Sequence, residues 1–303
     1  MKKEIFHIEL GNGIYLISST EFGTDTAMGK PTANSYLVVG EKKAVLIDLA
    51  VDVPDIRLYA EELAQKPLQT VITHCHPDHI YRMSEFDEVM FHREDSDFPL
   101  CEFSGISLPE KMPRISYLDE GDELDLVNRT LRVFHIPGHT SGSILLLDSL
   151  TGTLFSGDTV ARRLLYGLTG APSLPEFLKH LQRLESLPIR HIQSAHDRAD
   201  LGKEYISYMA DLIENELAKA EKQWQFPGFP EMINLVYASE ESPDYFDCAV
   251  PKSVLEDYKK TKRNRIFEKA DARYRKEMLR ESVSGLKQCS VPFLGKLRAA
   301  CVI

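Results

Sequence analysis

The sequence predicts an α/β fold in which a layered sheet is covered by helices. Short runs rich in apolar and β-branched residues, at positions 13–18, 35–40 and 43–51, are separated by glycine and proline, which is the pattern of strands joined by turns. Residues 55–65 carry apolar side chains three to four positions apart, which indicates a helix. A buried strand follows at 69–74, and this β-α-β order is typical of a sheet with helices outside it.

The later elements continue the same architecture up to about residue 200. They are strands at 89–92 and 115–118, strand pairs at 122–138 and 143–158, a helix at 174–187 and a last strand at 189–197. The helix has Leu174, Leu181 and Leu184 on one face, and Pro175 suits its first turn. We therefore predict that residues 1–202 form one domain.

Residues 203–303 are predicted to form a helical, basic C-terminal extension. Ile206, Met209 and Ile213 share one helical face, and a second charged helix is expected over residues 254–279. Between residues 252 and 298 there are 14 Lys and Arg against 6 Asp and Glu, a net charge of +8. We expect a solvated helix face that packs on the acidic remainder, joins two chains in a homo-oligomer or caps the pocket of its own chain.

The composition excludes several classes of partner. The chain of 303 residues has a net charge of −10 and a pI near 5.5, which disfavours nucleic acid and anionic membranes as partners. No run approaches the ~18 apolar residues of a membrane-spanning helix. Because the five cysteines are scattered and form no CxxC pair, the expected compartment is the reducing cytoplasm. With nucleic acid and membranes disfavoured, the expected partner is a small-molecule substrate.

The stretch VITHCHPDHI, residues 71–80, places four metal-ligand side chains on one loop. His74 and His76 are two positions apart, so in an extended segment they project to the same side. Asp78 and His79 follow the bend at Pro77, which brings them to a second point beside the first. A catalytic metal ion takes three protein ligands and keeps a position for water. Four side chains are too many for one such site and too few for two.

Three further candidates occupy the ends of later strands. His139 follows Gly138, Asp158 follows Gly157, and His196 follows Ala195, so each candidate comes after a buried strand and a small residue. Seven ligand-type side chains on four loops predict a site for two divalent metal ions. The spacing alone does not assign each ligand to an ion.

The four segments resemble the metal-binding motifs of the metallo-β-lactamase superfamily. HCHPDH is similar to the HxHxDH signature, PGHTSGS, FSGDT and SAHD resemble the later segments in the family's order, and LIDLA resembles a family strand. The resemblance covers residues 10–200 approximately and implies a four-layer αββα sandwich. It also implies the assignment of ligands, with Asp158 bridging two ions. The first ion would bind His74, His76 and His139, and the second Asp78, His79 and His196.

Differences within the superfamily narrow the expected activity. True zinc β-lactamases typically have a cysteine at the position of Asp158, and flavodiiron proteins a glutamate at that of His76. The remaining resemblance is to glyoxalase II, lactonases and related thioester or ester hydrolases. A persulfide dioxygenase, which uses one iron in the same ligand set, is the alternative. A nuclease with a basic nucleic-acid arm is a third, less favoured hypothesis.

The hydrolase hypothesis predicts two divalent ions, with zinc expected and iron or manganese as alternatives. The ions would lower the pKa of a shared water to about 7, and the bridging hydroxide would attack the carbonyl of a lactone, thioester or ester. Asp78 is the predicted catalytic residue, which orients the hydroxide and passes a proton to the leaving group. Tyr166, eight residues beyond Asp158, is a candidate substrate-binding donor, although its register differs from that of the tyrosine in some lactonases.

Several residues other than the seven candidate ligands and Tyr166 are expected to have supporting roles. Asp48 is expected to steady the ligand loop, and Thr73 and Thr140 are candidate hydrogen-bond partners of the ligands. The loops at 21–33 and 96–113 are candidate pocket walls. The other histidines lack the combination of a strand end and a small preceding residue, and they are expected to pack in the core or lie on the surface: His7, His92, His135, His180 and His191.

Overall fold

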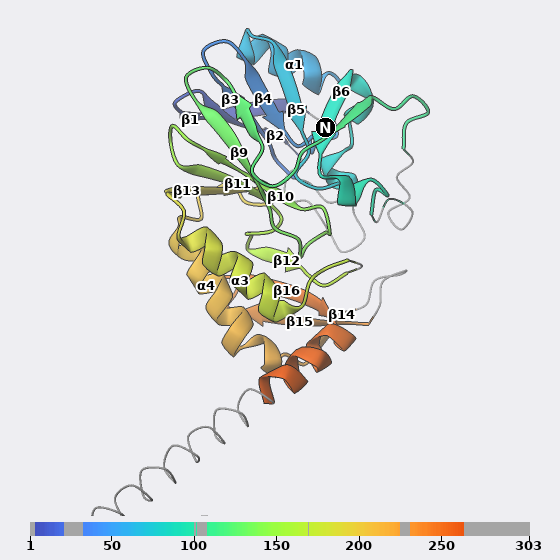
Figure 1. Ribbon diagram of the computed structural model, residues 1–303, viewed down its shortest axis with the longest axis vertical. Coiled ribbons are helices and arrows are strands. Elements are labelled where there is room, and N and C mark those ends of the chain that lie inside the picture. Colours follow the sequence, from blue (N-terminus) through green and yellow to red (C-terminus); the bar gives the residue numbers. More distant parts are fainter. Residues whose placement is uncertain are drawn as a thin grey trace, which may run out of the picture. The chain divides into compact units, whose positions relative to one another are not determined.

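The computed structural model describes residues 4–20, 33–99, 101, 108–168, 170–224 and 231–263 (Figure 1). The chain divides into two compact units, Met1–Glu256 and Asp257–Ile303. The strands and helices named below all belong to the first unit. Of the second unit, the described residues 257–263 are helical, as predicted for that part of the chain.

A seven-stranded sheet contains the first half of the chain, in the order β1-β2-β3-β4-β5-β6-β7. Its strands from β1 to β4 pair antiparallel, and those from β4 to β7 pair parallel. Their bounds are β1 (Ile5–Gly11), β2 (Ile14–Ser19), β3 (Ser35–Val39), β4 (Ala44–Ile47), β5 (Leu68–Val71), β6 (Glu88–Phe91) and β7 (Arg114–Tyr117). The helix α1 (Ile56–Ala64) connects β4 to β5 and buries Ile56, Ala60 and Ala64, which share its inner face.

A five-stranded sheet follows, in the order β13-β11-β10-β9-β8. Its strands β11 and β13 pair parallel, and its other pairs are antiparallel. The bounds are β8 (Glu123–Asp125), β9 (Thr130–His135), β10 (Ile144–Asp148), β11 (Thr153–Gly157) and β13 (His191–Ser194). The helices α3 (Leu174–Glu185) and α4 (Glu204–Asn215) pack against each other, on the side of this sheet away from β1–β7 (Figure 1).

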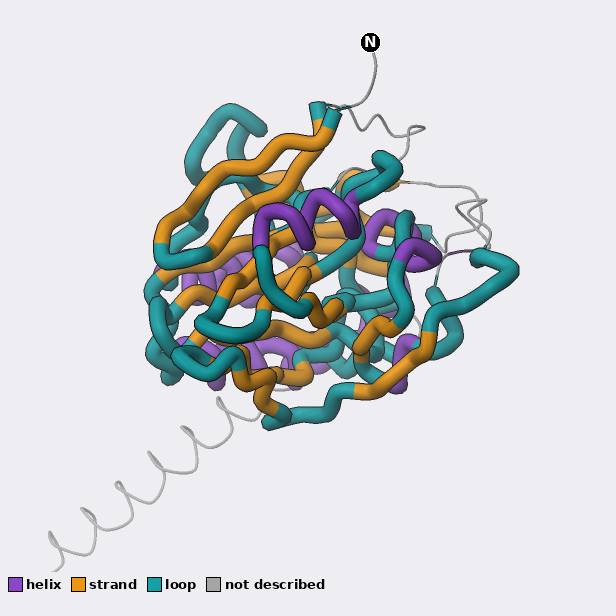
Figure 2. The backbone as a smooth tube through the Cα atoms, turned by 90° about the horizontal axis from the view of Figure 1, so that it is seen from above, coloured by secondary structure: helices purple, strands orange, loops and turns teal. Residues whose placement is uncertain are grey.

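The main apolar core lies between the two sheets. One buried cluster joins Leu16, Val38 and Val45 of the first sheet to Val133 and Leu146 of the second. The layers are therefore α1, the seven-stranded sheet, the five-stranded sheet, and α3 with α4. Figure 2 shows helices on both outer sides of the strands. The predicted αββα sandwich is confirmed, and the strand ends that carry the ligand-type residues meet at one edge of it.

The prediction of a purely helical extension beyond residue 202 is wrong in one respect. After α4 and the short turn η4 (Leu217–Lys219), the chain forms β14 (Lys222–Trp224), β15 (Met232–Tyr237) and β16 (Phe246–Pro251). These strands join β12 (Arg163–Leu165) in a four-stranded sheet ordered β12-β16-β15-β14. Because β12 pairs with β16, the compact unit continues to Glu256, past the predicted boundary at residue 202.

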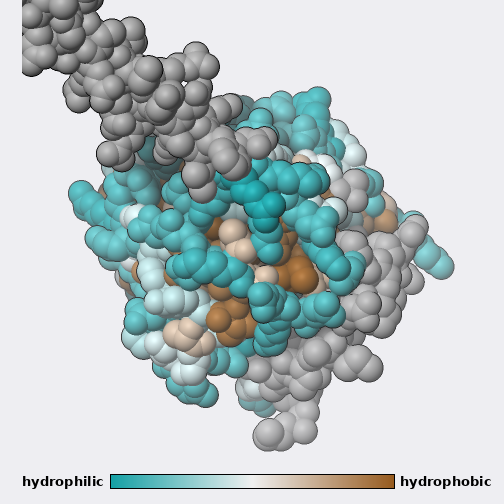
Figure 3. Space-filling model, turned by 90° about the horizontal axis from the view of Figure 1, so that it is seen from below, coloured by the Kyte–Doolittle hydropathy of each residue, from teal (hydrophilic) through white to brown (hydrophobic). Residues whose placement is uncertain are grey.

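Two surface properties bear on partners. Within the described ranges, no helix has both the length and the apolar character that a membrane span requires. On the face seen from below, apolar side chains gather in a hollow that hydrophilic side chains border (Figure 3). The predicted oligomeric or capping role of the C-terminal extension stays a prediction, and most of its second helix lies outside the described residues.

Candidate metal centre

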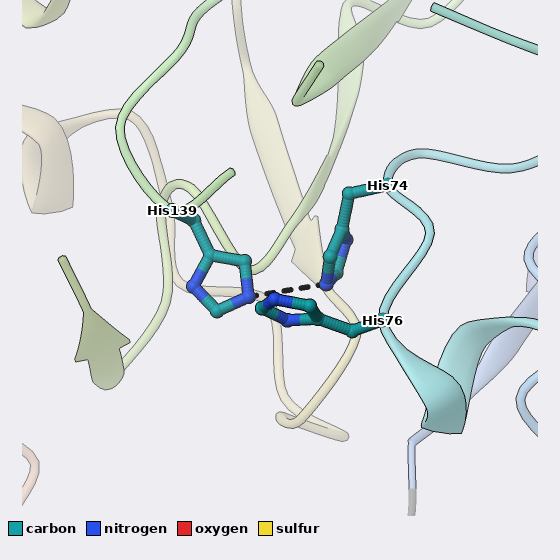
Figure 4. Close-up of side chains that lie close together, drawn as sticks. All are labelled: His74, His76 and His139. Carbon is teal, nitrogen blue, oxygen red and sulfur yellow. Dashed lines mark hydrogen bonds between the residues drawn. The ribbon is translucent and has the colours of Figure 1, made fainter. Parts of the chain in front are cut away.

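Three imidazoles converge between the loop after β5 and the loop after β9. The rings of His74 and His76 have centroids 4.7 Å apart, and the His139 ring lies 4.5 Å from each of them. The Nε2 atoms of His74 and His139 are 3.1 Å apart (Figure 4). All three residues are buried. Ligand atoms of this kind at this separation suit a single metal ion bound by three nitrogens.

A second group forms around the short turn η1 (Pro77–His79). The Oδ2 atom of Asp78 lies 3.4 Å from His196 Nε2 and 3.8 Å from His79 Nε2. His196 arrives from the loop after β13, whereas Asp78 and His79 lie on the turn itself. The three side chains place one donor atom each within 4.8 Å of one another, so they form a second possible site.

Asp158, at the end of β11, lies between the two groups. Its Oδ2 atom is 3.4 Å from His139 Nε2 and 3.1 Å from His196 Nε2, and its Oδ1 atom is 3.4 Å from His79 Nε2. The structure thus brings together all seven side chains that the sequence singles out. Asp158 has the position of a bridging carboxylate, and the binding of metal by the seven residues stays a prediction.

Glycine allows two of these loops to approach the centre closely. Gly157 has a φ of +51°, and a Cβ atom there would lie 2.6 Å from Oγ1 of Thr73. A Cβ atom on Gly138 would lie 2.8 Å from ring atoms of Phe177 and Tyr166. A larger residue at either position would push the following ligand away from the site, because the neighbouring atoms are already in contact.

Asp48 and a backbone carbonyl hold the ligand imidazoles in place. Asp48 accepts hydrogen bonds from the Thr73 backbone N–H, at 2.7 Å, and from its hydroxyl, at 2.8 Å, and its Oδ2 lies 3.0 Å from His79 Nδ1. The Nδ1–H of His139 donates to the Leu165 carbonyl at 2.8 Å, which leaves its Nε2 lone pair directed into the centre. The predicted role of Asp48 in steadying the ligand loop agrees with this geometry.

Asp95 is a structural link that the sequence did not indicate. Its buried carboxylate accepts hydrogen bonds from Cys75 N at 2.9 Å, Thr140 Oγ1 at 2.8 Å and Gly142 N at 2.7 Å. It therefore joins the loop of His74 and His76 to the loop of His139. Thr140 contacts Asp95, so its support of the ligands is indirect. In the sequence Asp95 is one of several acidic residues in a polar run, and no spacing distinguishes it.

The imidazoles of the centre form two groups that differ in the direction of their pKa shifts. Burial lowers the pKa of His74 and His76 well below the usual range, and neighbouring imidazoles lower it further. Burial also disfavours the charged form of His79 and His196, but neighbouring carboxylates outweigh burial and raise the pKa of both imidazoles well above the usual value. The strongest of these carboxylates is Asp48 for His79 and Asp158 for His196. Burial opposes ionisation of Asp78, yet His79 and His196 hold its pKa at about 2.

The donor atoms fit divalent transition-metal ions. The His79 Nε2 and Asp158 Oδ1 atoms are buried without a hydrogen-bond partner, which is costly unless a ligand satisfies them. The carboxylates that raise the pKa of His79 and His196 favour positive charge at this place, where a divalent cation would be stabilised. Imidazole nitrogens combined with carboxylate oxygens are the ligands that zinc, iron and manganese accept.

The structure does not support a substrate contact by Tyr166. This residue is fully buried, its hydroxyl donates to the Pro172 carbonyl at 2.6 Å, and its ring packs 4.8 Å from that of Phe177. The prediction is wrong because the chain turns the side chain into the core beneath Gly138. Of the predicted pocket walls, residues 21–32, 100 and 102–107 lie outside the described part of the chain.

Comparisons with known proteins agree with this geometry. The sequence model of the metallo-beta-lactamase superfamily matches residues 28–196. The human protein named acyl-coenzyme A thioesterase MBLAC2 is 29% identical over 188 residues, which are 51% of this chain and 66% of that protein. A hydroxyacylglutathione hydrolase of Xanthomonas campestris pv. campestris is 30% identical over 153 residues, 50% of this chain and 55% of that protein. The matched part is thus less than two thirds of each relative.

The fold has solved counterparts as well. A crystal structure of a metallo-beta-lactamase family protein from Thermus thermophilus matches with a TM-score of 0.54 and 22% identity, covering 71% of this chain and 85% of that one. At this identity the likeness concerns the fold. It agrees with the layered arrangement of the two sheets described above.

Proposed function

Because the chain belongs to the metallo-beta-lactamase superfamily, we propose that it is a metal-dependent hydrolase of small acyl substrates. The observation that carries the proposal is the convergence of five imidazoles and two carboxylates, from four loops, on one pocket. We propose two divalent ions as cofactors, most simply zinc. His74, His76 and His139 would hold one ion, Asp78, His79 and His196 the other, and Asp158 would contact both.

Thioesters are the preferred substrate class within this proposal. Two relatives are named for the hydrolysis of acyl-coenzyme A and of hydroxyacylglutathione, and in both compounds the acyl group is carried on a thiol sulfur. Asp158 stands where zinc β-lactamases typically have a cysteine, which disfavours antibiotic hydrolysis. Lactones and oxygen esters share the electrophilic carbonyl and are the secondary candidates.

The residues of the pocket supply positioning and proton transfer. When bound, the two ions would act as Lewis acids on the substrate carbonyl and would lower the pKa of a bound water to about 7. The carboxylate of Asp78 would accept a hydrogen bond from the attacking water and so orient it. It would take up a proton of that water and pass it to the departing thiolate.

The exposure of the seven side chains indicates where substrate enters. The His196 side chain is 23% exposed, whereas the side chains of Asp78 and Asp158 are 9% exposed and His79 is fully buried. Among these four side chains that of His196 is the most accessible, so we expect substrate to reach the centre beside it. A substrate carbonyl that arrives there meets the Asp78 side of the centre first, which suits an attack directed by Asp78.

Substitution of His76 by alanine tests the proposal. His76→Ala removes one nitrogen of the three-imidazole group, so we expect most of the metal to be lost and thioester hydrolysis to fall by more than about 100-fold. Metal per chain is measured by elemental analysis, and turnover by release of free thiol. His180→Ala, on α3 away from the centre, is the matched control and should retain both.

Unchanged turnover in His76→Ala would reject the assignment of this pocket as the active site. If the purified protein contained one iron per chain and took up oxygen with a persulfide substrate, the mononuclear dioxygenase hypothesis would replace the hydrolase hypothesis.

A further inference from the structure

A second cluster of metal-ligand side chains lies outside the seven residues of the candidate centre. His92 directly follows β6, Glu94 lies in the turn η3 (Arg93–Asp95), and His135 is the last residue of β9. One imidazole nitrogen of each histidine and one carboxylate oxygen of Glu94 lie within 4.8 Å of one another. From their sequence context these histidines were expected only to pack or to lie on the surface, since neither follows the pattern of strand end and small residue.

The cluster has the build of a shallow metal site. The rings of His92 and His135 are stacked, with centroids 3.8 Å apart and an angle of 16° between their planes. Glu94 Oε2 lies 3.9 Å from His135 Nε2, and Asp119 Oδ1 lies 3.9 Å from His92 Nε2. The His92 and His135 side chains are 7% and 20% exposed, whereas that of Glu94 is 53% exposed. Because a metal ion binds in the plane of an imidazole ring, one ring must tilt out of the stack before both nitrogens reach the same ion. The carboxylates lie at the open rim.

The contact between the two rings favours the neutral form of His92. Two protonated rings in such contact would repel each other, and the pKa of His92 is lowered first by burial and then by His135. Neutral imidazoles offer lone pairs to a metal ion near pH 7, and the nearby carboxylates attract a cation without occupying those lone pairs.

We propose that His92, His135 and Glu94 form a peripheral binding site for a transition-metal dication such as Zn²⁺, separate from the candidate active centre. Two imidazoles and one carboxylate make three protein ligands, and the exposed rim leaves a fourth position to water, which is a coordination that zinc accepts. Asp119, at the rim, is placed to balance the charge of the ion.

The surroundings make this site weaker than the buried centre. The Nε2 atom of His135 already lies 2.8 Å from the carbonyl of Ser141, and a metal bound through this nitrogen must replace that hydrogen bond. Glu94 must also rotate inward, because its carboxylate is largely exposed. We therefore expect the peripheral ion to bind after the buried centre is filled and to be removed first by a chelator.

A zinc titration of the full-length protein against a chromophoric chelator tests the proposal. After the tight sites are filled, the wild-type protein should bind one further zinc ion, and His135→Ala should not bind it. Glu94→Gln, at an exposed side chain that folding does not require, should bind it at least about 10-fold more weakly. His191→Ala, an exposed histidine of β13 that pairs with Asp200, is the matched control and should retain the additional ion.

Equal uptake of the additional zinc by the wild type and by both cluster variants would overturn the peripheral site, as would its absence from the wild type. The tight metal content and thioester hydrolysis of the same samples report on the buried centre independently. Failure of one proposal is therefore distinguishable from failure of the other.

Discussion

At the scale of single residues, the carboxylates determine which imidazoles keep a proton when no metal is bound. Asp48, Asp158 and Asp78 raise the pKa of His79, and Asp158 and Asp78 raise that of His196, although burial opposes both shifts. His74 and His76 have few such partners, and their pKa falls. A divalent ion at the Asp78 side must therefore displace protons from His79 and His196, whereas an ion at the other side meets neutral ligands.

The affinity for metal should accordingly rise with pH on the Asp78 side. Since the pKa of His79 and of His196 lies above the usual 6.5, both rings stay protonated at and somewhat above that pH. Each proton displaced makes the affinity increase about tenfold per pH unit until the pH exceeds the raised pKa. Chelator competition between pH 6 and 9 measures this. An affinity that does not change over the range would contradict the assigned protonation.

The convergence of the seven side chains could be predicted from the sequence, because each one follows a strand end and, in three cases, a small residue. The supporting contacts of Asp95 and of the Leu165 carbonyl could not be predicted, since they depend on which loops the fold places beside them. The prediction for Tyr166 was wrong for the same reason. Its distance along the chain from Asp158 does not show that the side chain turns into the core.

At the scale of elements, the close approach of β11 to the loop of His74 depends on a glycine. Gly157 ends the strand with a φ of +51°, and a Cβ atom there would lie 2.9 Å from Cβ of Thr73. The same Thr73 donates to Asp48. Any shift of this strand end would therefore move both Asp158 and the tether of the ligand loop.

Gly157→Ala should destabilise the protein by about 1–3 kcal/mol through strain at positive φ and should also reduce the metal content, because Thr73 must move. Gly121→Ala is the matched control. Gly121 has a φ of +89°, and a Cβ atom there would meet no neighbouring atom within 4 Å. Denaturant unfolding and elemental analysis separate the two effects. Full metal retention by Gly157→Ala would show that the contact with Thr73 does not position the ligands.

Most strands and helices up to residue 200 follow local patterns and could be predicted, but β1 and β12 were not predicted. The Ser173 and Glu176 pair that begins α3 agrees with the expected helix start, with the Ser173 N–H donating to Glu176 at 3.1 Å. The strands β14, β15 and β16 lie in the segment that was predicted to be helical. β16 pairs with β12, about 80 residues earlier in the chain, as in the pairing of Leu164 with Cys248, and local patterns carry no signal of so distant a pairing.

At the scale of the whole molecule, the guanidinium of Arg129 links the two large sheets, because it forms a buried ion pair with Asp148 of the five-stranded sheet and also contacts the turn between β1 and β2. The Nε atom of Arg129 donates to Asp148 Oδ1 at 2.8 Å, and a second guanidinium nitrogen contacts Oδ2. The same guanidinium donates to the carbonyl of Asn12, in the turn between β1 and β2. Arg129 and Asp148 have almost no exposed surface, so the loss of either partner leaves a charge buried without compensation.

Asp148→Asn should lower the free energy of unfolding by about 3–5 kcal/mol near pH 7. Burial opposes ionisation of Asp148, but Arg129 outweighs it and lowers the pKa of the carboxyl. The stabilisation by the ion pair is therefore complete above the pKa of Asp148 in the unfolded chain, about 3.9. It is lost as the pH falls through the lower pKa that Asp148 has in the folded protein. Denaturant titrations at pH 7 and pH 3 measure the difference, with the exposed Asp211→Asn as control. An equal loss at both pH values would exclude an ionic contribution.

We propose that the seven converging side chains hold two metal ions, which the protein uses to hydrolyse an acyl thioester. The most direct test adds zinc to the chelator-stripped protein and follows thiol release from an acyl thioester as a function of zinc per chain. We predict no turnover without metal and a rise that levels off at two equivalents bound at the centre. Turnover without metal, a plateau at one equivalent or no thioester hydrolysis at any zinc content would contradict it.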